Sequence, residues 1–352
     1  MPDVAQTDSL GLPVEIGRID QELKKLWRDS EGVATRASLM NLALYSEEPG
    51  SLARNTALMA KITENHACRG IVIEADCQSE ENRVSAWISA HCHVNRVGNK
   101  QVCSEQISFL LKGGCTRQMP GIVLSHLDSD LPFFLWWQEE FRAPMDPQLW
   151  IWVDRLIYDS HRWRDFKTQL QLLEAVRLET KQRVVLCDLN WTRLDPVRFA
   201  LAQFFDHPAS HHRLAKINRV RIDFAPGFRS TALLFAGWLG AQLEWAMETA
   251  QSAHELHFAT ASGRPVAVEL RERGEHPVQE VAVDSGDVNF LVTHARCGDL
   301  LEVCRSQRGD KGFSQLMPAA KNDFVSLLSA ELMRGGPHHV YLRAINCVGD
   351  LL

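Results

Sequence analysis

The sequence predicts a mixed α/β fold of two domains, each a mixed sheet flanked by helices. A chain of 352 residues is longer than a single hydrophobic core usually supports. VVLCDL (184–189) and INRVRIDF (217–224) are each followed by a helical pattern, and this β-α-β-α alternation favours a helix-covered sheet. From residue 254 onward, segments of alternating polarity predict a C-terminal part rich in antiparallel strands. We place the boundary near residue 165, which gives domains of residues 1–165 and 166–352.

Periodicity predicts the elements of the first domain in order. Two segments have apolar residues at helical spacing, and the second has Ser51 as its expected N-cap: 14–29 and 51–66. Strands are expected at 36–46, 69–76 and 131–137, with a helix-to-strand transition at 149–160. Two alternating runs joined by NRVGN predict a hairpin: 83–94 and 100–111.

The second domain is expected to contain helices at 163–180 and 321–334 and a final strand, HHVYLRAIN (338–346). In AGWLGAQLEW (236–245), small residues recur at one-turn spacing: Ala236, Gly237, Gly240 and Ala241. Such residues allow a helix to approach another backbone closely, so this pattern indicates packing rather than cofactor binding.

Composition excludes several functional classes. Hydrophobic residues make up 45% and charged residues 23%, as in ordinary globular proteins. The net charge of -6 and the lack of a basic run argue against nucleic acid as a partner. The longest apolar stretch, residues 231–241, is shorter than the roughly 20 residues that cross a bilayer, and the first residues lack a signal-peptide pattern. We therefore expect a cytoplasmic protein with no membrane partner.

The cysteines predict no disulfide framework. There are nine, at irregular spacing and without a CxxC motif, so most are expected to be buried thiols in a reducing compartment. Cys297, Cys304 and Cys347 are candidates for redox activity, but buried thiols are favoured because no CxxC motif or helix N-terminus would acidify them.

The segment LCDLNWTRLDPVRFALAQFFD (186–206) has the polar density of an active site. Asp195 followed by Pro196 predicts a helix start, with Leu194 and Phe199 as a hydrophobic staple. This leaves a polar group at the end of a predicted strand, where ligands often bind in α/β sheets: Asp188, Asn190, Thr192 and Arg193. Because no nucleophile–base pair is visible, a strand-to-helix joint or a docking surface is favoured over catalysis.

Two alternatives stay open for a small-molecule function. One is an enzyme with its site at the strand ends near Asp159, Asp188 and Asn190. The other is a sugar-phosphate-sensing module, for which the nearest cationic cluster is Arg213, Arg219 and Arg221. The sequence contains no GxGxxG, GxxxxGK[ST], HExxH or GxSxG motif, so we expect neither a cofactor nor a recognisable enzyme class.

Two further groups have both a functional and a structural interpretation. His91 and His93 share one strand face, and Cys103 is expected nearly opposite His91, so the three could bind zinc; hydrogen-bonded imidazoles are favoured instead. Trp136 and Trp137 could form an aromatic platform for a partner, or belong to a strand covered on both faces.

The segment DLNWTRLDPVRFALAQFFD (188–206) closely resembles the strongest signature of the OpcA family, the glucose-6-phosphate dehydrogenase assembly proteins. Four other segments are similar and occur in the expected order: CSEQISF (103–109), DLPFFLWW (130–137), RLIYDS (155–160) and LLFAGWLGAQLEW (233–245). The resemblance implies a non-catalytic protein of two α/β domains with no catalytic residues. It implies that the protein binds glucose-6-phosphate dehydrogenase and favours the active oligomer of that enzyme. The protein would then act as an allosteric activator in the pentose phosphate pathway. If exposed, Trp191, Thr192 and Arg193 would contribute to that interface.

Overall fold

The structure is a computed structural model that describes residues 10–28, 34–94, 101–143, 146–181, 183–206, 208–252, 254–295, 299–307, 310–349 and 351–352. These residues form two compact units that alternate along the chain. Unit 1 contains the described residues up to Tyr158 together with Thr168–Cys187 and Leu328–Gly336; unit 2 contains Asp159–Lys167, Asp188–Leu327 and the described residues from Pro337 onward. The sequence-based boundary near residue 165 stays a prediction.

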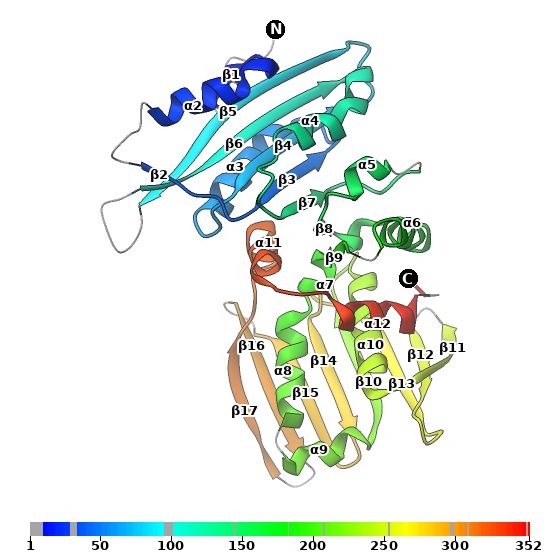
Figure 1. Ribbon diagram of the computed structural model, residues 1–352. Helices are drawn as coiled ribbons and strands as arrows, with labels where there is room; N and C mark the ends of the chain where they lie inside the picture. Colours follow the sequence, from blue (N-terminus) through cyan, green and yellow to red (C-terminus); the bar gives the residue numbers. More distant parts are fainter. Residues whose placement is uncertain are drawn as a thin grey trace. The chain divides into compact units, whose positions relative to one another are not determined.

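Unit 1 is built on a nine-stranded mixed sheet (Figure 1). Its strands are β1 (Leu12–Val14), β2 (Ala34–Arg36), β3 (Asn41–Ser46), β4 (Arg69–Asp76), β5 (Arg83–Val94), β6 (Gln101–Lys112), β7 (Phe133–Trp137), β8 (Arg155–Tyr158) and β9 (Val185–Asp188). Their order is β1-β5-β6-β4-β3-β7-β8-β9, with β2 paired to β6. The central strands β6, β4, β3, β7 and β8 are parallel to one another, whereas β5 is antiparallel to β1 and β6. Figure 1 shows helices alongside this parallel core.

The helices of the first half are η1 (Ile16–Arg18), α2 (Ile19–Arg28), α3 (Ser51–Thr63), η2 (Gly113–Gln118), α4 (Met119–Ser125), α5 (Pro147–Trp150) and α6 (Phe166–Glu179). The expected N-cap of α3 is wrong by one residue. Gly50, with φ of 77°, is the N-cap, and Ser51 is the first helical residue. The left-handed backbone at this position is one that glycine adopts readily.

Unit 2 is built on an eight-stranded sheet with the order β11-β12-β13-β10-β14-β15-β16-β17. The strands are β10 (Ile217–Phe224), β11 (Ala246–Ser252), β12 (Glu255–Ala259), β13 (Pro265–Glu272), β14 (Glu280–Ser285), β15 (Val288–His294), β16 (Leu300–Gln307) and β17 (Asp310–Pro318). Only the β10–β13 pair is parallel among the described strands of this sheet. The predicted mixed fold with a C-terminal part rich in antiparallel strands is confirmed.

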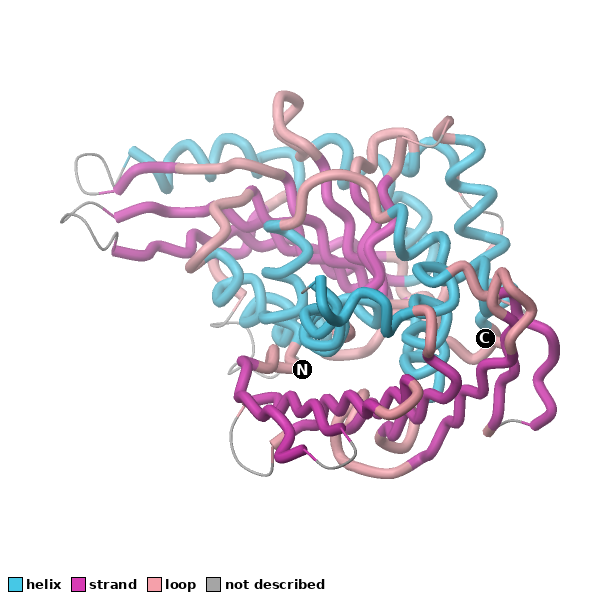
Figure 2. The backbone as a smooth tube through the Cα atoms, turned by 90° about the horizontal axis from the view of Figure 1, so that it is seen from below, coloured by secondary structure: helices cyan, strands magenta, loops and turns pink. Residues whose placement is uncertain are grey.

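The helices of the second half are η3 (Ser160–Arg162), α7 (Leu189–Thr192), α8 (Asp195–Asp206), α9 (Pro208–Leu214), α10 (Arg229–Leu243), α11 (Phe324–Met333) and α12 (His339–Val348). Figure 2 shows the eight-stranded sheet edge-on, with helices gathered over one of its faces. Val220, Ile222 and Phe224 of β10 are buried, whereas Arg219 and Arg221 point to the opposite face. No helix in the described part of the chain has the length and apolar character needed to cross a membrane.

The prediction of a final strand at 338–346 is wrong, because this segment forms helix α12. Its buried residues are Tyr341, Ala344, Ile345 and Val348, which recur at intervals of three and four. These positions form one stripe along a helix.

Candidate functional site

The segment DLNWT forms the joint between strand β9 and helix α7. Asp188 is the N-cap of α7, where its Oδ1 accepts a hydrogen bond from the backbone N–H of Asn190 at 2.9 Å. The hydroxyl of Thr192 donates to the Asp188 carbonyl oxygen at 3.1 Å. Aspartate suits this position because its side chain satisfies an amide that the first turn leaves without an intrahelical partner. The interpretation of this segment as a strand-to-helix joint is therefore confirmed.

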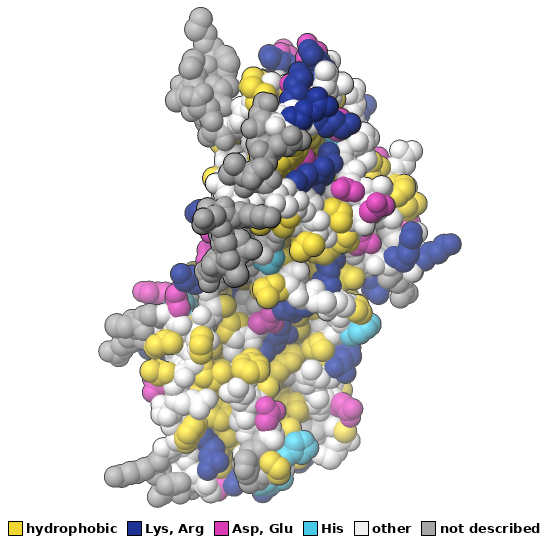
Figure 3. All heavy atoms as spheres, turned by 60° about the vertical axis from the view of Figure 1, so that its left-hand side comes forward, with side chains coloured by type: hydrophobic (Ala, Val, Ile, Leu, Met, Phe, Trp, Pro, Cys, Tyr) yellow, Lys and Arg dark blue, Asp and Glu magenta, His cyan; other side chains and the backbone are white. Residues whose placement is uncertain are grey.

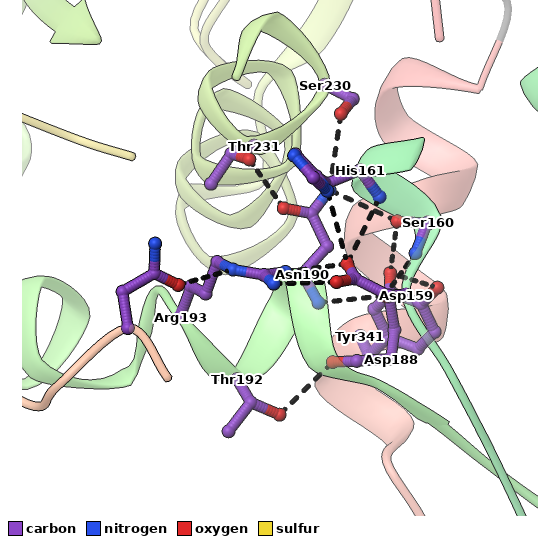
Figure 4. A network of polar contacts seen from close by, with 11 residues as sticks. Asp159, Ser160, His161, Asp188, Asn190, Thr192, Arg193, Ser230, Thr231 and Tyr341 are labelled. Carbon is purple, nitrogen blue, oxygen red and sulfur yellow. Dashed lines mark hydrogen bonds and ion pairs between the residues drawn. The ribbon is translucent and has the colours of Figure 1, made fainter. Parts of the chain in front are cut away.

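The Asp188 carboxylate is the centre of a buried polar group in unit 2, the Asp188 cluster, which it forms with Ser160, Asn190, Thr231 and Tyr341 (Figure 4). Its Oδ1 accepts from the Ser160 backbone N–H at 3.0 Å, and its Oδ2 accepts from the hydroxyls of Ser160 and Tyr341 at 2.6 and 2.8 Å. The residue is 0% exposed. Burial raises the pKa of Asp188 to about 6, although the hydrogen bonds from Ser160 and Tyr341 oppose the rise.

Asn190 extends the Asp188 cluster to helix α10. Its Nδ2 donates to the hydroxyls of Ser160 and Ser230 at 3.1 and 3.3 Å, and its Oδ1 accepts from the Thr231 hydroxyl. Asn190 is also 0% exposed. Buried polar groups are stable only when they are paired, so the cluster specifies how η3, α7, α10 and α12 pack together.

Arg193, the residue that follows α7, forms a two-point ion pair with Asp159. Its two terminal nitrogens lie 2.6 Å from the two carboxylate oxygens of Asp159, and its Nε donates to Asn322 Oδ1 at 2.7 Å. The side chains of Arg193 and Asp159 are only 5% and 8% exposed. The guanidinium fork matches a carboxylate in this geometry, so Arg193 is held within unit 2 rather than presented to solvent.

The predicted docking residues would need to be exposed to contact a partner, but three of them are buried. Trp191, Thr192 and Trp136 are 1%, 3% and 2% exposed. Trp191 packs against the Tyr341 ring, and the guanidinium of Arg198 lies 3.5 Å from its ring centroid. The expected staple is also wrong, because Phe199 is 60% exposed while Leu194 is buried. The signature therefore builds the interior of unit 2.

Trp137 is half-buried and stacks on the ring of Tyr45, with 4.0 Å between the centroids. Together with the burial of Trp136, this supports the interpretation of β7 as a strand covered on both faces.

The expected hairpin of β5 and β6 is confirmed, but its register is not the predicted one. Cys103 lies opposite Cys92 and forms a disulfide with it, and Ser104 lies opposite His91. Cys103 therefore points away from the histidine face, and the three predicted zinc ligands do not converge. The imidazoles are hydrogen-bonded instead: His91 Nε2 to Gln106 Oε1 at 2.8 Å and His93 Nε2 to Thr63 Oγ1 at 3.3 Å. The sequence predicted no disulfide framework, and it did not predict this single bridge among the described cysteines.

The redox candidates are not brought together by the described structure. Cys297 lies outside the described residues. Cys304 is on β16, with its Sγ 3.4 Å from Ser314 Oγ. Cys347 is on α12, where burial raises the pKa of its thiol, which disfavours the reactive thiolate. Their redox activity stays a prediction.

The arginines of the sugar-phosphate alternative are paired with carboxylates. Arg213 contacts Asp287, Arg219 contacts Glu269 at 2.9 Å, and Arg221 contacts Glu280. Arg219 and Arg221 do share one face of β10, as expected. These pairings weaken the case for a phosphate cradle made of the three arginines as a set.

A topological switch point in unit 1, not predicted from the sequence, is occupied by side chains of the chain itself. The strand order reverses at β3, which has β4 on one side and β7 on the other, and such a switch point receives ligands in many α/β proteins. Here the Glu74 carboxylate accepts from the backbone N–H groups of Gly50 and Leu52, at 3.1 and 2.7 Å, at the start of α3. A helix N-terminus is where a nucleotide phosphate would bind, so Glu74 occupies that position.

A second carboxylate lies at the end of β3. Glu139, which follows β7, accepts from the Ser46 hydroxyl at 3.0 Å and from the Glu47 backbone N–H at 2.7 Å. Asn55 and Gln138 exchange side-chain hydrogen bonds beside it, at 3.2 and 3.0 Å. Glu74, the acidic residue near the end of RGIVIEAD (69–76), was the sequence feature that could have indicated this arrangement. The order of the strands around β4 cannot be read from the sequence.

The fold and the sites define a protein of two α/β units in which the most polar segment is an internal joint and a carboxylate occupies the helix N-terminus at the switch point. Two family models match consecutive parts of the chain: the glucose-6-phosphate dehydrogenase subunit N-terminal domain over residues 59–175 and its C-terminal domain over residues 184–345. The chain belongs to the OpcA family.

Relatives named OxPP cycle protein OpcA agree with this membership. The protein from Synechocystis sp. is 25% identical over 254 residues, which cover 68% of this chain and 52% of the relative. The protein from Nostoc punctiforme is 26% identical over 319 residues, which cover 83% of this chain and 66% of the relative. The chain thus spans about half to two thirds of the length of these relatives.

Among solved structures, an aldose-aldose oxidoreductase from Caulobacter crescentus is similar with a TM-score of 0.48 and 8% identity, covering 90% of this chain and 96% of that one. A levoglucosan dehydrogenase has a TM-score of 0.43 and 11% identity, covering 90% of this chain and 89% of that one. At these values the similarity carries no argument about activity.

Proposed function

We propose that this chain binds a glucose-6-phosphate dehydrogenase and favours one oligomeric form of it, without carrying out a chemical step of its own. The observation that carries the proposal is the match to both the N-terminal and the C-terminal domain models of the family. A protein that binds only one state of an oligomer shifts the population toward that state, and this requires a rigid surface rather than a nucleophile.

Two features of the chain support a non-catalytic role. The carboxylate and amide of Asp188 and Asn190, where an enzyme site was the alternative, are 0% exposed and hydrogen-bonded within unit 2. In unit 1, Glu74 takes the position at the start of α3 that a dinucleotide phosphate would need. The first feature leaves the candidate reacting groups without access to substrate, and the second places a carboxylate where a phosphate would bind.

Apolar side chains that reach the surface offer contact area to such a partner. Figure 3 shows hydrophobic groups interspersed with charged ones on the surface of both units. Trp152 and Phe199 are each 60% exposed. Exposed tryptophan is enriched at binding hot spots, so Trp152 is the residue we would change first.

The test mixes the purified chain with the dehydrogenase of the same organism and measures mass by light scattering after size exclusion. We expect co-elution and a changed distribution of dehydrogenase oligomers, together with altered substrate saturation. Trp152→Ser should weaken co-elution while its melting temperature stays unchanged, and Arg83→Gln on the same unit is the control. The absence of co-elution and of any kinetic effect for the unmodified chain would contradict the proposal.

A further inference from the structure

A charged groove lies on the face of the unit 2 sheet opposite to its helices. It has a volume of about 480 Å³ and its lining, here called the β10 groove, is Arg221, Asp223, Arg271, Arg273, Gly274, Gln279, Glu280, Thr293 and His294. Strand register explains its shape: Asp223 lies opposite Arg271 on one neighbour and Glu280 on the other, and Glu280 lies opposite Thr293. These four residues form one row across the sheet. A volume of this size is in the usual range for small-molecule sites.

The centre of the row is a buried carboxylate whose Oδ1 has no hydrogen bond. Asp223 is only 5% exposed, and among the described residues its Oδ1 has no hydrogen-bond partner. Arg221 Nε faces it at 3.5 Å and is likewise without a hydrogen bond in the described part of the chain. Burial raises the pKa of Asp223. Arg221 pairs with this carboxylate without a hydrogen bond, so Asp223 Oδ1 can still accept one from a ligand hydroxyl.

The rim of the groove offers guanidinium groups for an anion. Arg273 is exposed and has no side-chain hydrogen bond or ion pair among the residues the structure describes. Its backbone N–H donates to the Phe224 carbonyl at 2.7 Å, which continues the strand pairing and places Arg273 on the same face as Arg271. Arg271 Nε donates to Glu269 Oε1 at 2.6 Å, and the two terminal nitrogens of Arg271 are left to contact a ligand. Two neighbouring guanidiniums suit the oxygens of a phosphate.

The lining decides the class of ligand. Apart from Gly274, every lining residue has a polar or charged side chain, so the groove suits a ligand rich in hydrogen-bonding groups. Carboxylates accept hydrogen bonds from hydroxyls, whereas guanidiniums donate to phosphate. We propose that the β10 groove binds a phosphorylated polyol, with the phosphate on Arg271 and Arg273 and hydroxyls donating to Asp223 and Glu280. This site is independent of the proposed function and is a property of the chain alone.

The test is calorimetric titration of the full chain with ribose 5-phosphate, and separately with ribose and with inorganic phosphate. We expect the ester to bind at least about tenfold more tightly than either half, because the two recognition elements act together. Arg273→Gln should weaken binding by about tenfold or more, and Arg83→Gln, an exposed arginine of unit 1, should leave it unchanged. Arg273 is at the surface, so circular dichroism of the variant should match the unmodified chain.

Asp223→Asn separates a polyol site from a simple anion site. If hydroxyls donate to Asp223, the change should weaken the ester by about tenfold, whereas an anion held by arginines alone should bind more tightly once a neighbouring negative charge is removed. The proposal is overturned by an absence of heat with the ester at about 1 mM, by equal affinity for inorganic phosphate, or by unchanged binding in Arg273→Gln.

Discussion

The Asp188 carboxylate makes both local and long-range hydrogen bonds. It caps α7 through the Asn190 N–H, and it also accepts from Ser160 and from Tyr341, 153 residues further along the chain. Its position at a strand end was predicted from local sequence, whereas the short helix α7 that it caps was not. The contact with Tyr341 was not predicted either, since it requires α12 to be a helix. Residues that look catalytic in sequence can therefore be the acceptors of a buried network.

The raised pKa of Asp188 gives a measurable dependence on pH. The pKa is about 6 in the folded chain against 3.8 for an ordinary aspartate, so the folded state holds the proton more tightly. The contribution to stability is full below about pH 4 and is lost as pH rises to about 6, a change of about 3 kcal/mol. Urea unfolding of the unmodified chain and Asp188→Asn from pH 4 to 8 should show their difference in unfolding free energy falling over that interval. A pH-independent difference would refute this.

Arg193 should matter for stability rather than for docking. Arg193→Glu places a carboxylate against Asp159 in a position where the arginine side chain is 5% exposed, so we expect a loss of about 3–5 kcal/mol of unfolding free energy. Arg193→Lys keeps the charge but loses the two-point pairing, so its loss should be smaller. Thermal or urea unfolding measures both. Equal stability of Arg193→Glu and the unmodified chain would show that the ion pair is not structural.

At the scale of elements, helix α10 shows what a sequence pattern can determine. The small residues of AGWLGAQLEW predicted a close approach to another backbone. A Cβ built on Gly237 would lie 2.4 Å from the Ala344 carbonyl oxygen and 2.8 Å from Val348 Cγ2, both on α12. The prediction of close packing is confirmed. The identity of the partner could not be predicted, because the periodicity of α12 was interpreted as that of a strand.

Gly237→Ala should therefore destabilise the protein, although alanine is the better helix former. The added methyl group meets backbone rather than a flexible side chain, and overpacking of this kind costs about 1–3 kcal/mol. Gly121→Ala in α4 is the matched control, since nothing lies within 4 Å of its Cβ. That change should stabilise by about 0.5–1 kcal/mol through helix propensity. Differential scanning calorimetry should show melting temperatures shifted in opposite directions; a higher one for Gly237→Ala would contradict the packing argument.

At the scale of the molecule, the fold class and most element positions followed from periodicity. Features that depend on how the strands pair could not be predicted: the disulfide between Cys92 and Cys103, the carboxylates at the switch point beside β3, and the row of charges across β10, β13 and β14. Each depends on strand register or strand order. A one-residue shift of register turns every side chain to the other face, which is how the predicted zinc site was lost.

A division of the chain at residue 165 should not yield two folded halves. Each unit draws residues from three stretches, and Thr168–Cys187 and Leu328–Gly336 complete unit 1 from beyond that point. Fragments 1–165 and 166–352 expressed separately should show reduced ellipticity and no cooperative melting. Co-expression should restore the signal of the full chain. Cooperative unfolding of fragment 1–165 alone would contradict this.

The alternation of the two units along the chain also constrains the order of events during synthesis. Unit 1 includes Leu328–Gly336, and unit 2 includes residues from Pro337 onward, so neither core is complete until those last segments have emerged from the ribosome. Domains made of one continuous stretch can fold while translation continues. Here each unit needs one of these late stretches, so a nonsense codon anywhere before residue 328 would leave both units incomplete rather than one.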